Sequence, residues 1–175
     1  MNYDVIVIGG GPPGENAADR AHRGGLSVAL VEHELLGGEC SYWACIPSKA
    51  LLRPVQLYDQ ARTMPGVTEA VTGLLDAGAV LKRRDWFASV DPSKPYGHDD
   101  AGQQSWLAGA GVAFVRGHGR LAGPKTVELT APNGETSTLT ANHAVVLATG
   151  TVATVPPVPG LREAHPWTSR EVTNA

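Results

Sequence analysis

Two cysteines, five positions apart, are the residues whose types and spacing most clearly indicate chemistry. Cys40 and Cys45 are the only two cysteines in the sequence. On a regular α-helix their Cα atoms would lie about 8–9 Å apart on different faces, whereas a disulfide needs a Cα separation below about 7 Å. A disulfide therefore requires Cys40 to lie before a helix or in a distorted first turn, with Cys45 nearer the helix start. Three interpretations stay open: a redox-active dithiol, half of a metal site, or two unrelated buried cysteines.

The residues after Cys45 favour a reactive thiol. Pro47 sits where a helix could begin, because proline is tolerated in the first turn. Residues 48–52 would continue that helix until Pro54 bends or stalls it. A helix N-terminus lowers the pKa of a thiol, and Lys49 could add positive charge one turn further on. No nearby pair of histidines completes a zinc site, so the redox dithiol is favoured and no metal site is expected.

A glycine-rich loop near the N-terminus is the second candidate site. Gly9, Gly11 and Gly14 follow the spacing GxGxxG, in which glycine permits a tight turn, close approach of a pyrophosphate and close packing of the following helix. Glu32 stands 18 residues after Gly14, near the position of an acid that holds a ribose hydroxyl. A structural turn with a surface glutamate is the alternative, and the motif does not separate FAD from NAD.

Both candidate sites need a sheet to position them. Residues 3–8 and 26–31 are apolar and β-branched, as in buried strands, and residues 15–23 between them predict a helix. The three form a β-α-β unit, which is typical of a parallel sheet. Further along, the sequence predicts helices over 71–81 and 103–110, and strands over 112–115, 126–130, 136–140 and 143–148. Residues 83–86 are expected at an exposed helix end, and no periodicity follows Gly160.

The composition is that of a globular domain. Of the 175 residues, 42% are hydrophobic and 18% charged, and the net charge is −3, which excludes a disordered polyampholyte. No run of Lys and Arg forms a basic stripe, so nucleic acid is not expected as a partner. No apolar run approaches the length of a membrane span, and the N-terminus lacks the features of a signal peptide. We expect a cytoplasmic protein, where a close cysteine pair favours redox or metal chemistry over a structural disulfide.

The segment around the cysteines resembles the active-site segment of the pyridine nucleotide-disulfide oxidoreductases. That family includes dihydrolipoamide dehydrogenase, glutathione reductase and mercuric reductase. Residues 37–49 read Gly-Gly-Glu-Cys-Ser-Tyr-Trp-Ala-Cys-Ile-Pro-Ser-Lys. Gly117–Leu121 looks like the family's glycine pair beside the adenine, Ala148–Gly150 resembles the segment that closes the FAD site, and Pro156–Gly160 looks like the connection to the next domain. The resemblance runs from Met1 to about Leu161.

The resemblance implies an α/β fold: a Rossmann-like parallel sheet with helices on both faces plus a small antiparallel β-meander. Residues 1–150 would form an FAD-binding domain that lacks its C-terminal return segment. Residues 151–175 would be a linker towards an NAD(P)-binding domain that the chain does not contain. The family's dimerisation domain, with its acid/base histidine, is also absent, so we expect only the N-terminal FAD-binding part.

The resemblance also assigns roles to residues. Cys45 would be the charge-transfer thiolate beside the flavin, and Cys40 the interchange thiol that attacks the substrate. Electrons would pass from NAD(P)H, whose site is not in this chain, through FAD to this pair and then to a small-molecule disulfide or related acceptor. A full-length chain would be a homodimer. The expected FAD-binding residues are Gly9, Gly11, Gly14, Glu32, Gly38, Lys49, Gly117, His118, Thr149 and Gly150.

One departure from the family pattern falls between the cysteines. Familiar members carry Val-Gly or Ile-Gly before the second cysteine, whereas this chain has Trp43 and Ala44. We expect the indole of Trp43 to narrow access to Cys40. The alternative to an enzyme part is a flavin- or nucleotide-binding module, or a thiol switch, without turnover of its own.

Overall fold

The computed structural model describes residues 1–174 and divides them into two compact units. Unit 1 comprises Met1–Cys40 and Asp91–Val152. Unit 2 comprises residues 41–90 and the described residues from Ala153 onward. In the described part of the chain, no helix is long and apolar enough to cross a membrane.

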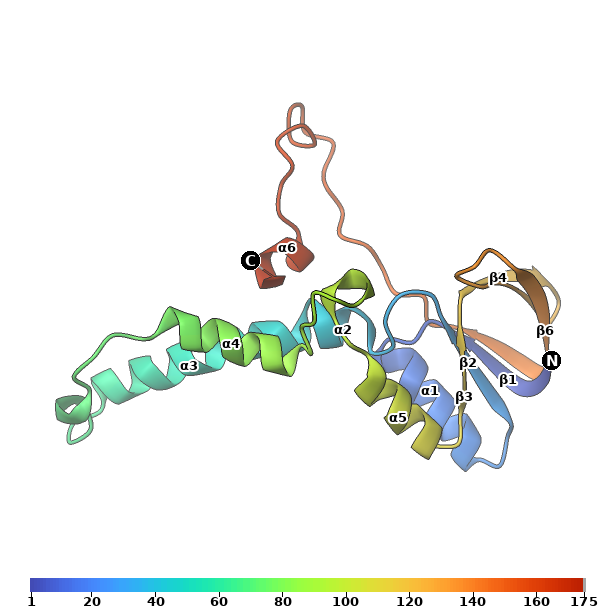
Figure 1. The fold of residues 1–175 in the computed structure, drawn as a ribbon, viewed down its shortest axis with the longest axis horizontal. Helices are drawn as coiled ribbons and strands as arrows, with labels where there is room; N and C mark the ends of the chain where they lie inside the picture. The colour runs from blue at the N-terminus through green and yellow to red at the C-terminus, as the bar shows by residue number, and fades with distance from the viewer. Residues whose placement is uncertain (175) are drawn as a thin grey trace. The chain divides into compact units, whose positions relative to one another are not determined.

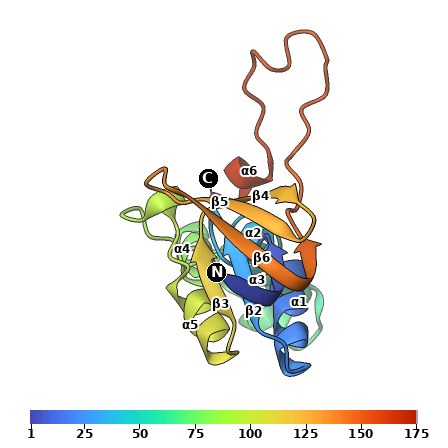
Figure 2. The ribbon, with the colours of Figure 1, turned by 90° about the vertical axis from the view of Figure 1, so that its right-hand side faces the viewer.

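Unit 1 is built on one mixed sheet, which among the described residues has six strands in the order β3-β2-β1-β6-β5-β4. The strands are β1 (Asn2–Ile8), β2 (Val28–Glu32), β3 (Ala113–Arg116), β4 (His118–Gly123), β5 (Thr126–Thr130) and β6 (Thr136–Leu147). The pairs β1–β2, β2–β3 and β1–β6 are parallel, and β4–β5 and β5–β6 are antiparallel. Figure 2 shows the antiparallel strands β4, β5 and β6 curling away from the parallel part.

Two helices pack on the parallel strands of unit 1, as Figure 1 shows. They are α1 (Pro12–Arg23), which connects β1 to β2, and α5 (Ala101–Gly109), which precedes β3. One core lies on the side of these helices and contains Val5, Val7, Ala18, Val28, Leu30, Leu36, Leu107 and Val112. A second core joins the other face of β1 and β2 to the antiparallel strands through Ile6, Ile8, Val31, Val127, Leu129, Leu139 and Ala141. The alternation of side chains along a strand sends neighbouring residues to different cores.

Strand β6 joins the parallel and antiparallel parts of the sheet. The sequence predicts two separate strands here, over 136–140 and 143–148, but the structure has one strand from Thr136 to Leu147. Its register on β1 shifts between the pairs Tyr3–Ala141 and Val5–Ala144, so β6 carries one extra residue at this point. That irregularity interrupts the alternation of inward and outward side chains without ending the strand. A bulge adds one residue to a strand, while the strand pairing on either side of it continues.

Unit 2 is helical in its described part. Helix α3 (Cys45–Thr63) and helix α4 (Ala77–Phe87) run side by side (Figure 1) and are joined through a 3-10 turn at Thr68–Ala70. The hydroxyl of Tyr58 on α3 donates to the carbonyl oxygen of Gly73 at 2.8 Å and fixes the connecting loop. A short helix, α6 (Ser169–Asn174), ends the described chain. The five-residue helix α2 (Gly38–Tyr42) precedes α3.

Two local predictions are wrong in unit 2, and Pro54 does not stall its helix. Helix α3 continues nine residues beyond Pro54 to Thr63, since an internal proline removes one hydrogen bond but need not end a helix. The helix predicted over 71–81 begins only at Ala77, where the Asp76 carboxylate accepts a capping hydrogen bond from the Ala79 N–H at 3.0 Å. Arg84, expected at an exposed helix end, is buried with 7% of its surface exposed.

Candidate functional site

The glycine loop after β1 is packed too closely for side chains at two of its glycines. A Cβ at Gly9 would lie 2.2 Å from the carbonyl oxygen of Ala148, and a Cβ at Gly14 would lie 1.8 Å from that of Gly9. Gly9 also has a φ of 105°, a conformation that favours glycine. These two glycines therefore serve the contact between α1, the loop and the end of β6.

Gly11 is different, because among the described residues outside its two chain neighbours none lies close enough to explain the absence of a side chain there. A Cβ built on Gly11 would have the Pro13 side chain as its nearest neighbour beyond those two residues, at 3.9 Å. The φ of Gly11, −75°, suits any residue. Gly11 stands at the N-cap of α1, where no side chain caps the helix, and the prolines at 12 and 13 supply no N–H. The loop thus leaves open space beside backbone at the positive end of a helix dipole, which suits a phosphate.

Glu32 lies at the end of β2 and is tied to the glycine loop. One carboxylate oxygen accepts from the N–H of Gly10 at 2.7 Å, and the other accepts from the N–H of Glu34 at 2.7 Å. The residue is buried, and His33 Nδ1 lies 3.2 Å from its second oxygen. Each carboxylate oxygen has a further lone pair, so the fixed carboxylate can still accept a hydrogen bond from a ribose hydroxyl.

Gly117 and His118 follow β3 and lie beside Glu32. The Gly117 N–H donates to the carbonyl oxygen of Glu32 at 3.0 Å, and a Cβ at Gly117 would lie 2.6 Å from the carbonyl oxygen of Thr130. The His118 ring packs edge-on against that of His33, with centroids 5.7 Å apart. Gly117 and His118 therefore lie next to the end of β2.

Two further predicted residues, Gly38 and Thr149, adjoin the glycine loop. The backbone of Gly38, with a φ of 57°, packs against Gly11, since a Cβ at Gly38 would lie 2.9 Å from the Gly11 Cα. The N–H of Thr149 would lie 3.0 Å from a Cβ at Gly9. Gly150 has a φ of 68°, and a Cβ built there would meet no described atom within 4 Å outside its two chain neighbours.

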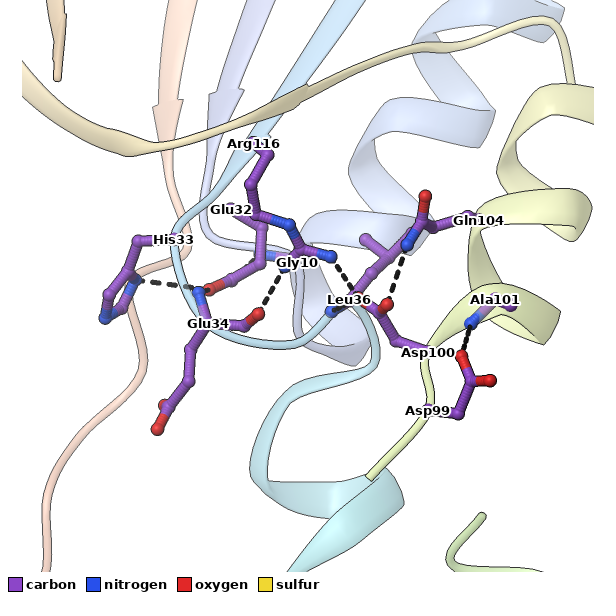
Figure 3. A network of polar contacts seen from close by, with 10 residues as sticks. All are labelled: Gly10, Glu32, His33, Glu34, Leu36, Asp99, Asp100, Ala101, Gln104 and Arg116. Atoms are coloured by element: carbon purple, nitrogen blue, oxygen red, sulfur yellow. Dashed lines mark hydrogen bonds and ion pairs between the residues drawn. The ribbon is translucent and has the colours of Figure 1, made fainter. Parts of the chain in front are cut away.

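A polar network missed by the sequence analysis supports the loop that follows β2 (Figure 3). Asp100 accepts from the Leu36 N–H at 2.9 Å and from Gln104 Nε2 at 2.7 Å, and it forms an ion pair with Arg116. Arg116 also donates to the carbonyl oxygen of Glu34. Burial alone would raise the pKa of Asp100, but the hydrogen bonds from Arg116, Leu36 and Gln104 outweigh it and hold that pKa below its ordinary value.

Glu15, in the first turn of α1, carries a buried oxygen that lacks a partner within residues 1–174. Burial raises the pKa of Glu15 to about 7. The carboxyl group is therefore partly protonated near neutral pH, which limits the negative charge beside a helix N-terminus suited to phosphate.

The structure joins the two cysteines of the chain in a disulfide. Cys40 lies in the short helix α2, and Cys45 is the first residue of α3. This confirms the prediction that Cys40 precedes the helix and that Cys45 stands at its start. No side chain caps α3. Because Cys45 is the first residue of this helix, it stands at the positive end of the helix dipole, where a thiolate is stabilised.

Lys49 is exposed on α3 and lines a cavity of ≈ 380 Å³ in unit 2. The walls of the cavity combine apolar and cationic side chains from α3 and α4: Ile46, Lys49, Ala50, Leu52, Arg53, Gln56, Arg83 and Phe87. The guanidinium carbon of Arg83 lies 4.5 Å from the centroid of the Phe87 ring. Lys49 can therefore supply positive charge along the helix that begins at Cys45.

The predicted site residues fall into two groups. Unit 1 brings together the glycine loop, Glu32, Gly38, the Gly117–His118 pair and Thr149. Unit 1 also contains Cys40 and Gly150, and unit 2 contains Cys45 and Lys49. Asp100 and Arg116 could not be predicted from the sequence, because their partners are 64 and 82 residues away in the chain. No local pattern signals such contacts.

Comparisons with known proteins show the family to which the chain is similar. The sequence pattern of the family described as pyridine nucleotide-disulphide oxidoreductase matches residues 3–175. A dihydrolipoyl dehydrogenase of Chlorobaculum parvum is 39% identical over 159 residues, which cover 91% of this chain and 32% of that protein. A soluble pyridine nucleotide transhydrogenase of Pseudomonas putida is 35% identical over 154 residues, covering 85% of this chain and 31% of that protein.

A solved structure confirms the fold. The copper(II) complex of the HOCl-induced flavoprotein disulfide reductase RclA from Escherichia coli superposes with a TM-score of 0.74 over 100% of this chain and 35% of that chain, at 20% identity. The Rossmann-like architecture with an added antiparallel meander is thus as predicted. This chain spans only about a third of the length of most of these relatives.

Proposed function

Because the chain belongs to the pyridine nucleotide-disulphide oxidoreductase family, we propose that it is the FAD-binding, redox-disulfide part of such an enzyme. The family resemblance noted in the sequence is thereby confirmed. The observation that carries the proposal is the Cys40–Cys45 disulfide, with Cys45 at the first position of an uncapped helix. A disulfide joined at a helix start suits reversible redox chemistry, because the helix dipole stabilises the thiolate that reduction releases.

FAD fits the residues of unit 1. Gly11 offers open space and backbone at a helix N-terminus for the pyrophosphate, and the buried Glu32 carboxylate can hold a ribose hydroxyl. In the family pattern Gly117 and His118 lie beside the adenine, and Thr149 and Gly150 close the site. When bound, the flavin supplies the capacity to accept a hydride and pass on two electrons.

The chain's own chemistry is thiol–disulfide exchange. In the reduced form, the Cys40 thiolate attacks one sulfur of an acceptor disulfide, forms a mixed disulfide and releases one acceptor thiolate. The Cys45 thiolate then attacks the Cys40 sulfur, re-forms the Cys40–Cys45 disulfide and releases the second thiolate. Two protons complete the two acceptor thiols, so the acceptor gains two electrons and the chain's pair loses them.

The remaining assignments follow the family pattern. NAD(P)H is the electron donor and a small-molecule disulfide or related compound the acceptor. The whole enzyme is a homodimer. Lys49 adds positive charge near the flavin ring. A cytoplasmic location suits a chain whose two cysteines are both committed to one redox pair.

Substitution of Gly11 by alanine tests FAD binding with little expected change in the fold. A Cβ at Gly11 would lie no closer than 3.9 Å to any described residue outside its two chain neighbours, but it would occupy the side on which the pyrophosphate approaches. We expect Gly11→Ala to weaken FAD binding at least about tenfold, measured by titration calorimetry. Gly102→Ala is the matched control, because its Cβ would also meet open space, on α5. Equal FAD affinity in both variants, or no binding by the unaltered chain, would contradict the proposal.

A further inference from the structure

Trp43, which stands between the two cysteines, is held from several sides within unit 2. Only 3% of its surface is exposed. Its ring meets that of Tyr42 edge-on, with centroids 5.9 Å apart. The guanidinium carbon of Arg170, on α6, lies 3.8 Å from the indole centroid, a distance typical of a strong cation–π contact. The indole is thus enclosed by neighbours, so its packing gives no support to the expected role as a gate at Cys40.

The backbone of Trp43 is held by the same helix. The Thr173 hydroxyl lies 3.0 Å from the carbonyl oxygen of Trp43 and 2.9 Å from that of Ser169, one turn earlier on α6. A hydroxyl has one proton, so the two carbonyl oxygens share it. Thr173 is buried, with 6% of its surface exposed. A buried hydroxyl between two backbone acceptors fixes the position of α6 against the peptide of Trp43.

Helix α6 is itself anchored at both ends. At its start, the Thr168 N–H donates to the Glu171 carboxylate at 2.7 Å, which is the reciprocal half of a capping box. At its end, Arg84 on α4 donates to the carbonyl oxygen of Thr173. Arg84 also pairs with Asp85 at 2.7 Å. A buried cation at the C-terminal carbonyls of a helix is favourable, so a helix too short to be stable alone is held by α4 and by its cap.

We propose that α6 is a positioning element for the redox pair: through Thr173 and Arg170 it holds the peptide and ring of Trp43, and so keeps the segment between Cys40 and Cys45 in the conformation that closes the disulfide. This inference rests on the proposed function, since it concerns the same cysteines. The physical effect is entropic. A segment that is already ordered loses less conformational entropy when the disulfide closes. Its two thiols therefore have a higher effective concentration towards each other.

Thr173→Val tests the proposal without a change of charge. Valine has the shape of threonine but cannot donate to the Trp43 carbonyl oxygen. The chain is equilibrated in mixtures of reduced and oxidised dithiothreitol, which gives two electrons and two protons to the disulfide as it is oxidised to its own cyclic disulfide. The fractions of dithiol and disulfide are then read from the mass added by a thiol alkylating reagent. We expect the ratio of dithiol to disulfide to rise about twofold to tenfold, the range for one hydrogen bond.

Two variants serve as controls in this measurement. Thr173→Ser keeps the hydroxyl and should restore the ratio of the unaltered chain. Thr154→Val makes the same change at an exposed threonine of the same tail and should leave the ratio unchanged. If Thr173→Val gives the same ratio as Thr154→Val, the proposal is overturned. A merely structural role for Thr173 would lower stability without moving this ratio.

Hydrogen exchange provides the reciprocal readout. If α6 stabilises the disulfide, the disulfide must stabilise α6 by the same factor, because the coupling is mutual. We expect the amides of residues 169–174 to exchange about twofold to tenfold faster in the reduced chain, with little change at β1. Equal exchange of α6 in the two redox states would overturn the inference. Neither measurement requires flavin, so failure of FAD binding would contradict the proposed function while leaving these results interpretable.

Discussion

At the scale of single residues, the glycine loop shows one residue type used for two purposes. Gly9 and Gly14 lack side chains because backbone atoms lie within 2.2 Å and 1.8 Å of a built Cβ. Gly11 lacks one although the protein leaves room for it. The spacing GxGxxG does not distinguish these cases, since each glycine fits the same pattern. Only the packing separates glycines that hold the fold from the one that leaves room for a ligand.

Glu15 gives a prediction that belongs to this scale. Its pKa is raised by burial to about 7 from an ordinary value of 4.5, so the folded chain binds more protons than the unfolded chain between those values. The free energy of unfolding should therefore fall as pH rises from about 4.5 to about 7. We expect Glu15→Gln to remove this dependence and to stabilise the chain by roughly 1–2 kcal/mol at pH 8, less than the full shift implies because the residue is partly exposed.

The measurement is urea unfolding at pH 5 and pH 8. The gain from Glu15→Gln should be largest at pH 8 and should nearly vanish at pH 5, where the carboxyl group is largely protonated in the folded chain. Glu69→Gln is the control, because Glu69 is exposed in unit 2. If Glu15→Gln raised the free energy of unfolding by the same amount at pH 5 and pH 8, ionisation of the buried Glu15 carboxyl group would not be the cause, and the prediction would be wrong.

At the scale of elements, Asp100 joins three segments of unit 1: the loop after β2, helix α5 and strand β3 (Figure 3). We expect Asp100→Asn to lower the free energy of unfolding by about 2–3 kcal/mol at pH 7, because Arg116 would lose its carboxylate partner. The folded pKa of Asp100 is lowered. Its contribution is therefore present above the unfolded pKa of about 3.9 and is lost as pH falls through the folded value.

Denaturant unfolding as a function of pH checks this expectation. The difference between the unaltered chain and Asp100→Asn should be constant near neutral pH and should shrink below about pH 4. Asp59→Asn is a matched control, since Asp59 is exposed on α3. If the difference persisted unchanged at low pH, the loss would arise from packing and not from the charge of Asp100.

The elements themselves could be predicted from the sequence where their patterns are local. The β-α-β unit, strand β5 and the helix predicted over 103–110 lie within a few residues of their predicted bounds. Strand β4 and helix α6 were missed. The glycines of β4 do not read as a strand, and α6 has six residues, too few to show a helical period. It forms because Arg84 and Trp43, 89 and 130 residues from Thr173, hold it.

At the scale of the whole molecule, more of the candidate site than of the supporting fold could be predicted from the sequence. The cysteines and the glycine loop are contiguous motifs with narrow chemical uses, so the family resemblance found them directly. The supporting contacts of Asp100 and of Trp43 join segments far apart in the sequence, and only the folded chain brings them together. Cys40 and the candidate residues of the glycine loop belong to unit 1, whereas Cys45 and Lys49 belong to unit 2, a division that no motif indicates.

One measurement tests the central claim, that this chain combines an FAD site with a redox-active disulfide. The purified chain is loaded with FAD and titrated stepwise with dithiothreitol under nitrogen, while its visible absorbance spectrum is recorded. We predict a long-wavelength charge-transfer band that appears as the disulfide is reduced, is absent in Cys45→Ser, and is present before reduction in Cys40→Ser. Bound flavin whose spectrum gains no such band, with both thiols reduced, would contradict the account.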